Sequence, residues 1–319
     1  MLFEHAPRLF YSVFGLSLVI ALLGLIPTFY EGTPEWVLFG VLILATGLPH
    51  GATDHTLHAF TCRQKGLPVK WLPFFAHYLT AIVLFSASWI WLPIFSLVVF
   101  LMVSAYHFGQ SQFLYLKLPE YHPFKVALYF AWGGALLLGL LWFHHEAAKT
   151  ILQPVLGADH WLWKAFVANG QTIVAGLWGL VLLGWGVALK EKWMRPQAAG
   201  AELLVATLLF LLIQLTPLIV AFSVYFGLWH ALSSMTEEIQ RLQQEEPRFG
   251  FAAFYRHAWP FTLLSIVGIG LLVGASVYFK QQVSPYLLFF IAISALTMPH
   301  IVAIGRFYTL PRKLSITRE

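Results

Sequence analysis

Apolar stretches of membrane-spanning length recur along the whole chain, and they constrain its fold more than any other feature of the sequence. A helix needs about 17–25 predominantly apolar residues to cross the hydrocarbon core of a bilayer. The 319 residues are 59% hydrophobic and only 10% charged, too few charged groups to cover a soluble surface. We therefore predict a polytopic all-α integral membrane protein that forms one transmembrane domain over residues 1–319. The predicted spans are 9–29, 36–57, 71–91, 93–116, 123–143, 166–189, 201–235, 258–279 and 285–308.

The stretch 201–235 decides whether the bundle has nine or ten spans. As one helix it would be about 50 Å long, well beyond a ~30 Å hydrocarbon core, and Thr216-Pro217 offers a break. With a break the chain has ten spans, and only then do all three basic clusters lie on the same side of the membrane. The positive-inside rule predicts that this side is the cytoplasmic one. Ten spans also predict that both termini are cytoplasmic in a multi-pass protein of the cell membrane, and that the polar segment 237–256 is a cytoplasmic helix or loop. The basic residues used are Arg63, Lys65, Lys70, Lys190, Lys192, Arg195, Arg306, Arg312, Lys313 and Arg318.

The charged residues and the single cysteine exclude several classes of partner and site. The net charge of +5 comes from clusters between apolar stretches, as membrane topology requires, so we expect no nucleic-acid partner. Cys62 is the one cysteine of the chain, which excludes an internal disulfide and any zinc or iron–sulfur site built from several cysteines. Any metal must therefore be held by nitrogen or oxygen atoms.

Four histidines are predicted to lie at one depth in the bilayer. In the ten-span topology they occur twelve to fifteen residues into four spans that run in the same direction. At 1.5 Å per residue, all four then lie about 18–22 Å from the outer surface. Imidazoles that project from facing helices at one level predict a metal site in the bundle core. These histidines are His50, His107, His230 and His300, while His77 lies at a similar level and is an alternative to His300.

Asp54 is the acidic residue predicted to support this cluster. It follows His50 by four residues, so the two side chains would share one helix face. A carboxylate in that place accepts the second ring N–H of a metal-bound histidine and offsets part of the metal charge. The alternative is a carboxylate at a helix end that faces interfacial water.

The residue types favour redox chemistry on an apolar substrate. Neutral imidazole suits Fe(II), Zn(II), copper and nickel. A hydrolytic zinc site often includes a glutamate base, and we expect no glutamate within the inner halves of the spans that carry the histidines. Tyr106 and Phe108 beside His107, and Trp229 beside His230, are candidate aromatic walls for a hydrophobic substrate, with plain packing as the alternative.

Four short motifs surround the predicted histidine cluster. They are Leu48-Pro49-His50-Gly51-Ala52-Thr53-Asp54, Tyr106-His107-Phe108-Gly109, Leu228-Trp229-His230 and Met298-Pro299-His300. Together they resemble the Brp/Blh family of membrane β-carotene 15,15′-dioxygenases. The resemblance implies a non-haem iron enzyme that uses Fe(II) and O2 to cleave the central double bond of a lipophilic carotenoid within the lipid bilayer, giving retinal, for which a retinal-binding opsin is a candidate acceptor. It implies that His50, His107 and His230 are iron ligands and catalytic residues, with Asp54 close to the first.

Two positions depart from the pattern of that family. Ser234 stands where the family usually has a second histidine four residues after His230, and Gln112 stands where an acidic residue is usual. The fourth ligand is therefore open to His300, to His77 or to water. A diverged member that binds or cleaves another carotenoid or apocarotenoid is an alternative. A transporter that binds ions or protons through its histidines and a bis-histidine haem protein are two others.

Overall fold

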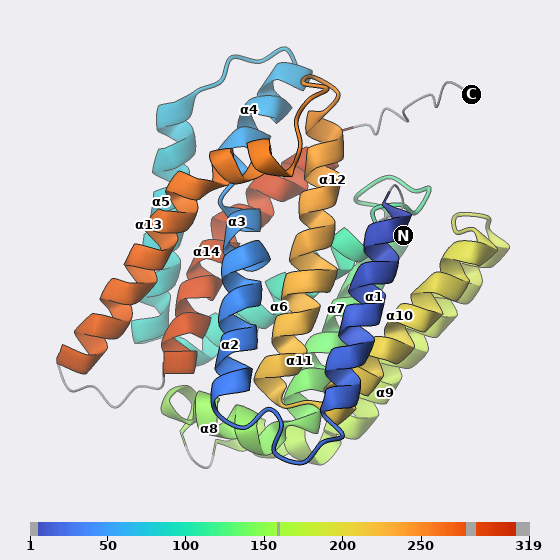
Figure 1. The fold of residues 1–319 in the computed structure, drawn as a ribbon, viewed down its shortest axis with the longest axis vertical. Coiled ribbons are helices and arrows are strands. Elements are labelled where there is room, and N and C mark those ends of the chain that lie inside the picture. Colours follow the sequence, from blue (N-terminus) through green and yellow to red (C-terminus); the bar gives the residue numbers. More distant parts are fainter. Residues whose placement is uncertain (1–5, 158–159, 279–284, 311–319) are drawn as a thin grey trace.

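The computed structural model describes residues 6–157, 160–278 and 285–310, and every regular element in these ranges is a helix. The helices form one bundle, with the short α8 lying across one end (Figure 1). Arg312, Lys313 and Arg318, which entered the topology prediction, lie outside the described residues. The elements are α1 (Pro7–Leu23), α2 (Thr33–Leu42), η1 (Ile43–Gly47), α3 (Leu48–Gly51), α4 (Asp54–Gln64), α5 (Trp71–Trp91), α6 (Pro93–Gln112), α7 (Pro123–Phe143), α8 (His145–Leu156), α9 (Trp161–Lys190), α10 (Pro196–Leu215), α11 (Leu218–Val224), η2 (Tyr225–Ala231), α12 (Leu232–Leu242), α13 (Phe251–Tyr278) and α14 (Pro285–Tyr308).

The chain is a polytopic helical membrane protein, as predicted. Nine helical runs among the described residues are long and apolar enough to cross a bilayer, and α1, with 17 residues, is a shorter apolar helix beside them. The stretch 201–235 forms two helices, because Thr216 is extended and Pro217 has no amide hydrogen to continue α10. The Pro7 end of α1 and the Tyr308 end of α14 consequently lie at the same end of the bundle (Figure 1). Which end faces the cytoplasm stays a prediction.

The start of the segment 237–256, predicted to be a cytoplasmic helix or loop, is helical and continuous with the preceding helix, and its position relative to the membrane stays a prediction. Helix α12 continues to Leu242 and forms part of a membrane-spanning run. Arg241 is buried because its guanidinium reaches the Glu237 carboxylate at 2.6 Å and donates to the carbonyl groups of Phe307 and Leu310. A charge that finds such partners does not need water, so the polar residues of this segment did not mark the end of the helix.

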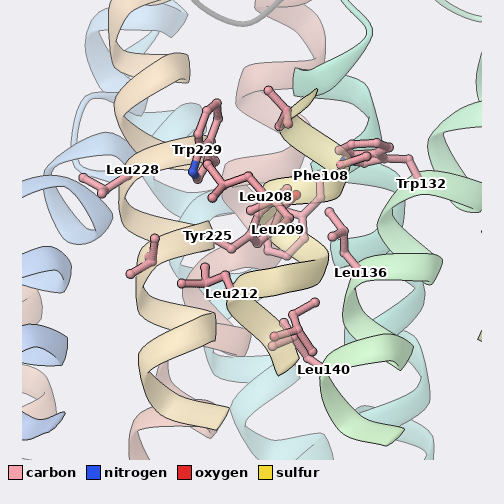
Figure 2. Packing of buried hydrophobic residues seen from close by; sticks show 14 of the residues in the cluster. Phe108, Trp132, Leu136, Leu140, Leu208, Leu209, Leu212, Tyr225, Leu228 and Trp229 are labelled. Atoms are coloured by element: carbon pink, nitrogen blue, oxygen red, sulfur yellow. The ribbon is translucent and has the colours of Figure 1, made fainter. Parts of the chain in front are cut away.

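The largest apolar cluster lies on one side of the bundle, between α7, α10 and the run from α11 to α12. Figure 2 shows leucines of α10 between Trp132 and Leu136 of α7 on one side and Trp229 on the other. The indole N–H of Trp229 donates to the Ser17 hydroxyl of α1, which ties the first helix to this cluster. Lipid is as apolar as these side chains, so close packing rather than exclusion of water holds such helices together.

Two glycines allow α6 and α7 to cross closely next to His107. A methyl group at Gly109 would overlap with the backbone of Tyr129, and one at Gly133 would overlap with the backbone of Ala105. Small residues at facing positions are typical of tightly crossed membrane helices. This close contact, two residues after His107, fixes the position of α6 along α7.

Substitution Gly109→Ala is expected to lower the free energy of unfolding by about 3 kcal/mol, the upper part of the range for overpacked positions, because the overlapping atoms belong to backbone that cannot rotate away. SDS-induced unfolding in lipid micelles would measure the change. Gly176→Ala on α9 is the matched control, since nothing lies within 4 Å of the added methyl group. Equal stability of the two variants would show that the α6–α7 crossing tolerates separation.

Candidate metal centre

The four histidines predicted to share one depth come together in the bundle. Their side chains are buried, and the ring centroids of His50 and His300, and of His107 and His230, are 4.7 Å apart. The His107 and His300 centroids are 5.0 Å apart, and those of His50 and His230 are 5.4 Å apart. His50, His107 and His230 can each offer one ring nitrogen within 4.8 Å of the other two. Binding of a metal by these residues stays a prediction.

Two π-helical turns place His50 and His230 in this cluster. The turn η1 ends three residues before His50, and η2 contains His230. The turns pack against each other through glycines, since a methyl group at Gly47 would come within 2.7 Å of Phe226 and one at Gly227 within 2.9 Å of Leu42. A wider helical turn rotates the residues that follow it, and such turns are frequent at functional sites.

Pro49 contributes to the local shape before His50. It has no amide hydrogen, so the helix cannot make the bond that would join residue 49 to the carbonyl group of Ala45. The Tyr255 hydroxyl of α13 donates to that carbonyl group at 2.6 Å. The free carbonyl group is thus satisfied by a neighbouring helix, as a backbone polar group in a membrane requires.

Three of the four histidines have a polar neighbour at Nδ1, which is a hydrogen-bond partner for His300 and His230 and a close charge contact outside hydrogen-bond geometry for His50. His50 Nδ1 lies 2.8 Å from Glu238 Oε1, and His300 Nδ1 lies 2.8 Å from Asp54 Oδ1. His230 Nδ1 lies 3.0 Å from the Ser111 hydroxyl, which itself donates to the carbonyl group of Phe108. Acceptors at Nδ1 hold the proton there and leave Nε2 free to bind a metal.

The expectation that Asp54 supports His50 is corrected by this geometry, because Asp54 is paired with His300. The helix is interrupted at Ala52 and Thr53, between α3 and α4, so residues 50 and 54 do not stand one regular turn apart. The other oxygen of Asp54 accepts a hydrogen bond from Tyr78 of α5 at 2.8 Å. Asp54 is buried and does not face interfacial water.

The expectation that no glutamate lies near the histidines is also wrong. Glu238 of α12 is fully buried and fills the place beside His50 that was assigned to Asp54. One signal was present in the sequence, since Glu238 follows His230 by eight residues, two turns along the same helix. Its Oε2 atom accepts a hydrogen bond from the Thr53 hydroxyl, and its Oε1 atom lies 2.8 Å from His50 Nδ1. Ser111 was missed because a serine in an apolar helix carries no pattern of its own.

Of the remaining predicted site residues, only Phe108 lies at the cavity beside the histidines, and His77, Tyr106 and Trp229 lie elsewhere. Exposed His77 bonds to the carbonyl group of Pro73, because its neighbour Tyr78 is the residue of that turn that faces Asp54. Tyr106 packs against Tyr129 and Phe130 of α7, and Trp229 packs in the cluster of Figure 2, so neither is among the described residues that line the cavity beside the histidines. Successive helical residues point about 100° apart, so a neighbour of an inward histidine need not share its face. Phe108 does line this cavity, and its ring centroid lies 4.7 Å from that of His230.

An apolar cavity of about 1010 Å³ opens beside the histidines. Its walls come from most of the helices around the site, including α5, α13 and α14 on one side and α7, α8 and α11 on another. The four histidines, Asp54 and Tyr78 provide a polar region in an otherwise mainly apolar wall. This volume is at the upper end of the ~300–1000 Å³ usual for ligand pockets, and the wall suits a long hydrocarbon.

The nitrogen atoms that face this centre fit a bound metal ion. In the described part of the chain, Nε2 of His50, His107 and His300 is buried and makes no hydrogen bond. A buried polar atom without a partner costs about 1–3 kcal/mol, and here several occur side by side. Neutral imidazole nitrogens in a cluster, with carboxylates behind two of the rings, are ligands that iron and other first-row metals accept.

Comparison with known proteins matches most of the chain to one family. The sequence profile of the family described as Beta-carotene 15,15′-dioxygenase matches residues 41–308, which include all four histidines. A protein named Beta-carotene 15,15′-dioxygenase from Uncultured marine bacterium 66A03 is 27% identical over 283 residues, which cover 82% of this chain and 90% of that protein. No solved structure matches the chain.

Proposed function

The chain belongs to the β-carotene 15,15′-dioxygenase family, and on that premise we propose that it cleaves the central 15,15′ double bond of β-carotene, or of a closely related carotenoid, with O2 to give retinal. We assign the reaction to a non-haem Fe(II) centre held by His50, His107 and His230. The enzyme acts as one catalytic domain in the cell membrane with both termini in the cytoplasm. A retinal-binding opsin as acceptor of the product stays a prediction.

The observation that carries this proposal is the position of the buried histidine cluster in the wall of a large apolar cavity. A carotenoid is a long hydrocarbon that dissolves in the bilayer, so its enzyme needs an apolar chamber within the membrane. It also needs a redox-active group at that chamber, because no side chain by itself activates O2. The cluster and the cavity meet both needs in one place.

The protein groups have distinct tasks in the proposed reaction. Bound Fe(II) supplies the activation of O2. The apolar wall, including Phe108 and Phe226, holds the polyene against the histidines and excludes water from the reacting bond. One carbon–carbon double bond breaks, and each of its carbons gains one oxygen atom of O2, so that two carbonyl groups form. Asp54 and Glu238 keep the rings of His300 and His50 oriented.

We assign the fourth ligand to His300, on α14. Its Nε2 atom is buried beside the other rings, and Asp54 holds its Nδ1 atom. Ser234 is buried, and its side chain is too short to replace an imidazole as a ligand beside His230. A histidine from α14 thus takes over the role of the residue that this chain lacks at position 234.

Expression in a bacterium that makes β-carotene tests the proposed function. We expect the cells to lose their yellow colour and to accumulate retinal, measured by chromatography of the extracted pigments. Fragments of unequal length would support cleavage of another bond instead. Unchanged β-carotene in cells whose membranes contain the folded, iron-loaded protein would contradict the proposal.

A further inference from the structure

Glu238 is a fully buried carboxylate in a helix that crosses the membrane. Its Oε1 atom lies 2.8 Å from His50 Nδ1, and its Oε2 atom accepts from the Thr53 hydroxyl at 3.0 Å. That hydroxyl is also 3.0 Å from the backbone carbonyl group of His50. Glu238 is therefore held by one hydrogen bond, from Thr53, and its second oxygen makes a close charge contact with His50 outside hydrogen-bond geometry, so both contacts are with the interrupted segment that carries His50.

The charge of Glu238 needs a positive partner, because an isolated carboxylate in a low-dielectric interior is costly. The nearby Arg241 is occupied by Glu237 and by carbonyl groups of the chain around Tyr308. Asp54 is in a comparable position, with His300 and Tyr78 at its two oxygens. The metal centre thus has two buried carboxylates, each behind a different histidine.

A histidine that binds a metal through Nε2 keeps its proton on Nδ1 and is neutral. In the loaded centre His50 and His300 would then carry no charge, and the two carboxylates would face only the charge of the metal. Two carboxylates match the two charges of a divalent ion. A site of four neutral imidazoles without them would leave that charge unbalanced in an apolar bundle.

We propose that Glu238 is the second carboxylate of the metal centre: it orients the His50 ring through Nδ1–H and, together with Asp54, balances the charge of a divalent metal. This inference rests on the proposed metal centre and adds to it a positioning residue on α12. It also explains why a glutamate occupies a fully buried position in a membrane helix, where a glutamine or an apolar residue would cost less in the absence of a metal.

Metal affinity of the variant Glu238→Gln tests the proposal, because glutamine keeps the size of the side chain and removes its charge. The full-length protein would be purified in detergent, stripped with a chelator and titrated with Co(II), whose visible absorption reports both binding and ligand geometry. We expect Co(II) to bind 10- to 100-fold more weakly than to the wild type, the range found when a partner behind a metal ligand is removed. The Co(II) spectrum should change as well, because the His50 ring is less firmly oriented.

Glu202→Gln is the matched control. Glu202 of α10 is equally buried, and its carboxylate accepts from Gln112 rather than from a histidine of the cluster. We expect this variant to bind Co(II) within about twofold of the wild type. An equal loss of affinity in both variants would mean that any buried glutamine disturbs the bundle, and it would overturn the proposal.

Thr53→Val provides a second route if Glu238→Gln does not fold. It removes the hydroxyl that holds Oε2 and leaves the charge in place, so we expect a several-fold loss of Co(II) affinity. The assignment of Glu238 would be overturned if the folded Glu238→Gln variant bound Co(II) with wild-type affinity and spectrum. If only Thr53→Val folds, the same result in that variant would overturn it. Neither result would bear on retinal formation by the wild type. Conversely, a wild type that binds Co(II) in this charge-dependent way but does not cleave β-carotene with Fe(II) would contradict the proposed function alone.

Discussion

Substitution of His107 by alanine is expected to remove the bound metal and to lower carotenoid cleavage by more than about 100-fold. The reason is that His107 lies between His230 and His300 in the cluster, at ring distances of 4.7 and 5.0 Å. Loss of a partner behind a ligand already costs about 10- to 100-fold, so loss of the ligand itself should cost more. Iron content of the purified variant and retinal formation by it measure the two effects.

His77→Ala is the control for this prediction. His77 is a histidine in a membrane-spanning helix at a similar predicted depth, but it is exposed and bonds to the carbonyl group of Pro73. We expect wild-type iron content and activity in this variant. Full iron content in His107→Ala would contradict the assigned ligand set, as would loss of iron in His77→Ala.

Blocking the cavity is expected to lower the rate of carotenoid cleavage without affecting the metal content. Gly268 of α13 belongs to the stripe of that helix that lines the cavity, and nothing lies within 4 Å of a carbon atom added to it. In Gly268→Phe the ring would therefore occupy space that the polyene needs. We expect kcat/KM to fall at least tenfold, equivalent to about 1.4 kcal/mol of transition-state stabilisation, with iron content unchanged.

Gly270→Phe is the matched variant on the same helix. Gly270 also has open space around it, but it is not among the described residues that line the cavity. We expect wild-type kcat/KM, measured with β-carotene in detergent micelles. A similar loss in both variants would show that the effect comes from α13 as a whole, and wild-type activity in Gly268→Phe would place the substrate elsewhere.

The sequence predicted the spans and the level of the histidines because these depend on local regularities. Helices α5, α7 and α14 have the predicted bounds, since a proline or a tryptophan marks the start of each and an aromatic residue its end. The break at Pro217 decided the direction of the helix that carries His230. Once four parallel helices were assigned, a rise of 1.5 Å per residue was enough to align their histidines.

The partners of these histidines could not be predicted in the same way, because they depend on irregular backbone and on contacts between distant helices. Because the helix is interrupted at Ala52 and Thr53, Asp54 contacts His300 rather than His50. Glu238 lies beside His50 instead. The π-helical turns η1 and η2 shift the face of each residue that follows them. Tyr106 and Trp229 were assigned to the substrate wall because they adjoin His107 and His230 in sequence, but successive helical residues point in different directions, and neither lines the described cavity.

The short helix α8 was also missed, for a related reason. It has 12 residues, too few to cross a bilayer, and its sequence alternates charged and apolar residues in a helical pattern. Such an amphipathic helix lies along a membrane surface. Ala148, Ile151 and Leu152 of α8 line the cavity, so an element outside the predicted spans forms part of its wall.

Product analysis with the purified, Fe(II)-loaded protein, β-carotene and O2 tests the central claim most directly. If the histidine cluster is an iron centre that acts on the central double bond, two molecules of retinal should appear for each β-carotene consumed, and the chelator-stripped protein should form none. Equal activity of the stripped protein, or consumption of β-carotene that yields fragments of unequal length, would contradict the account.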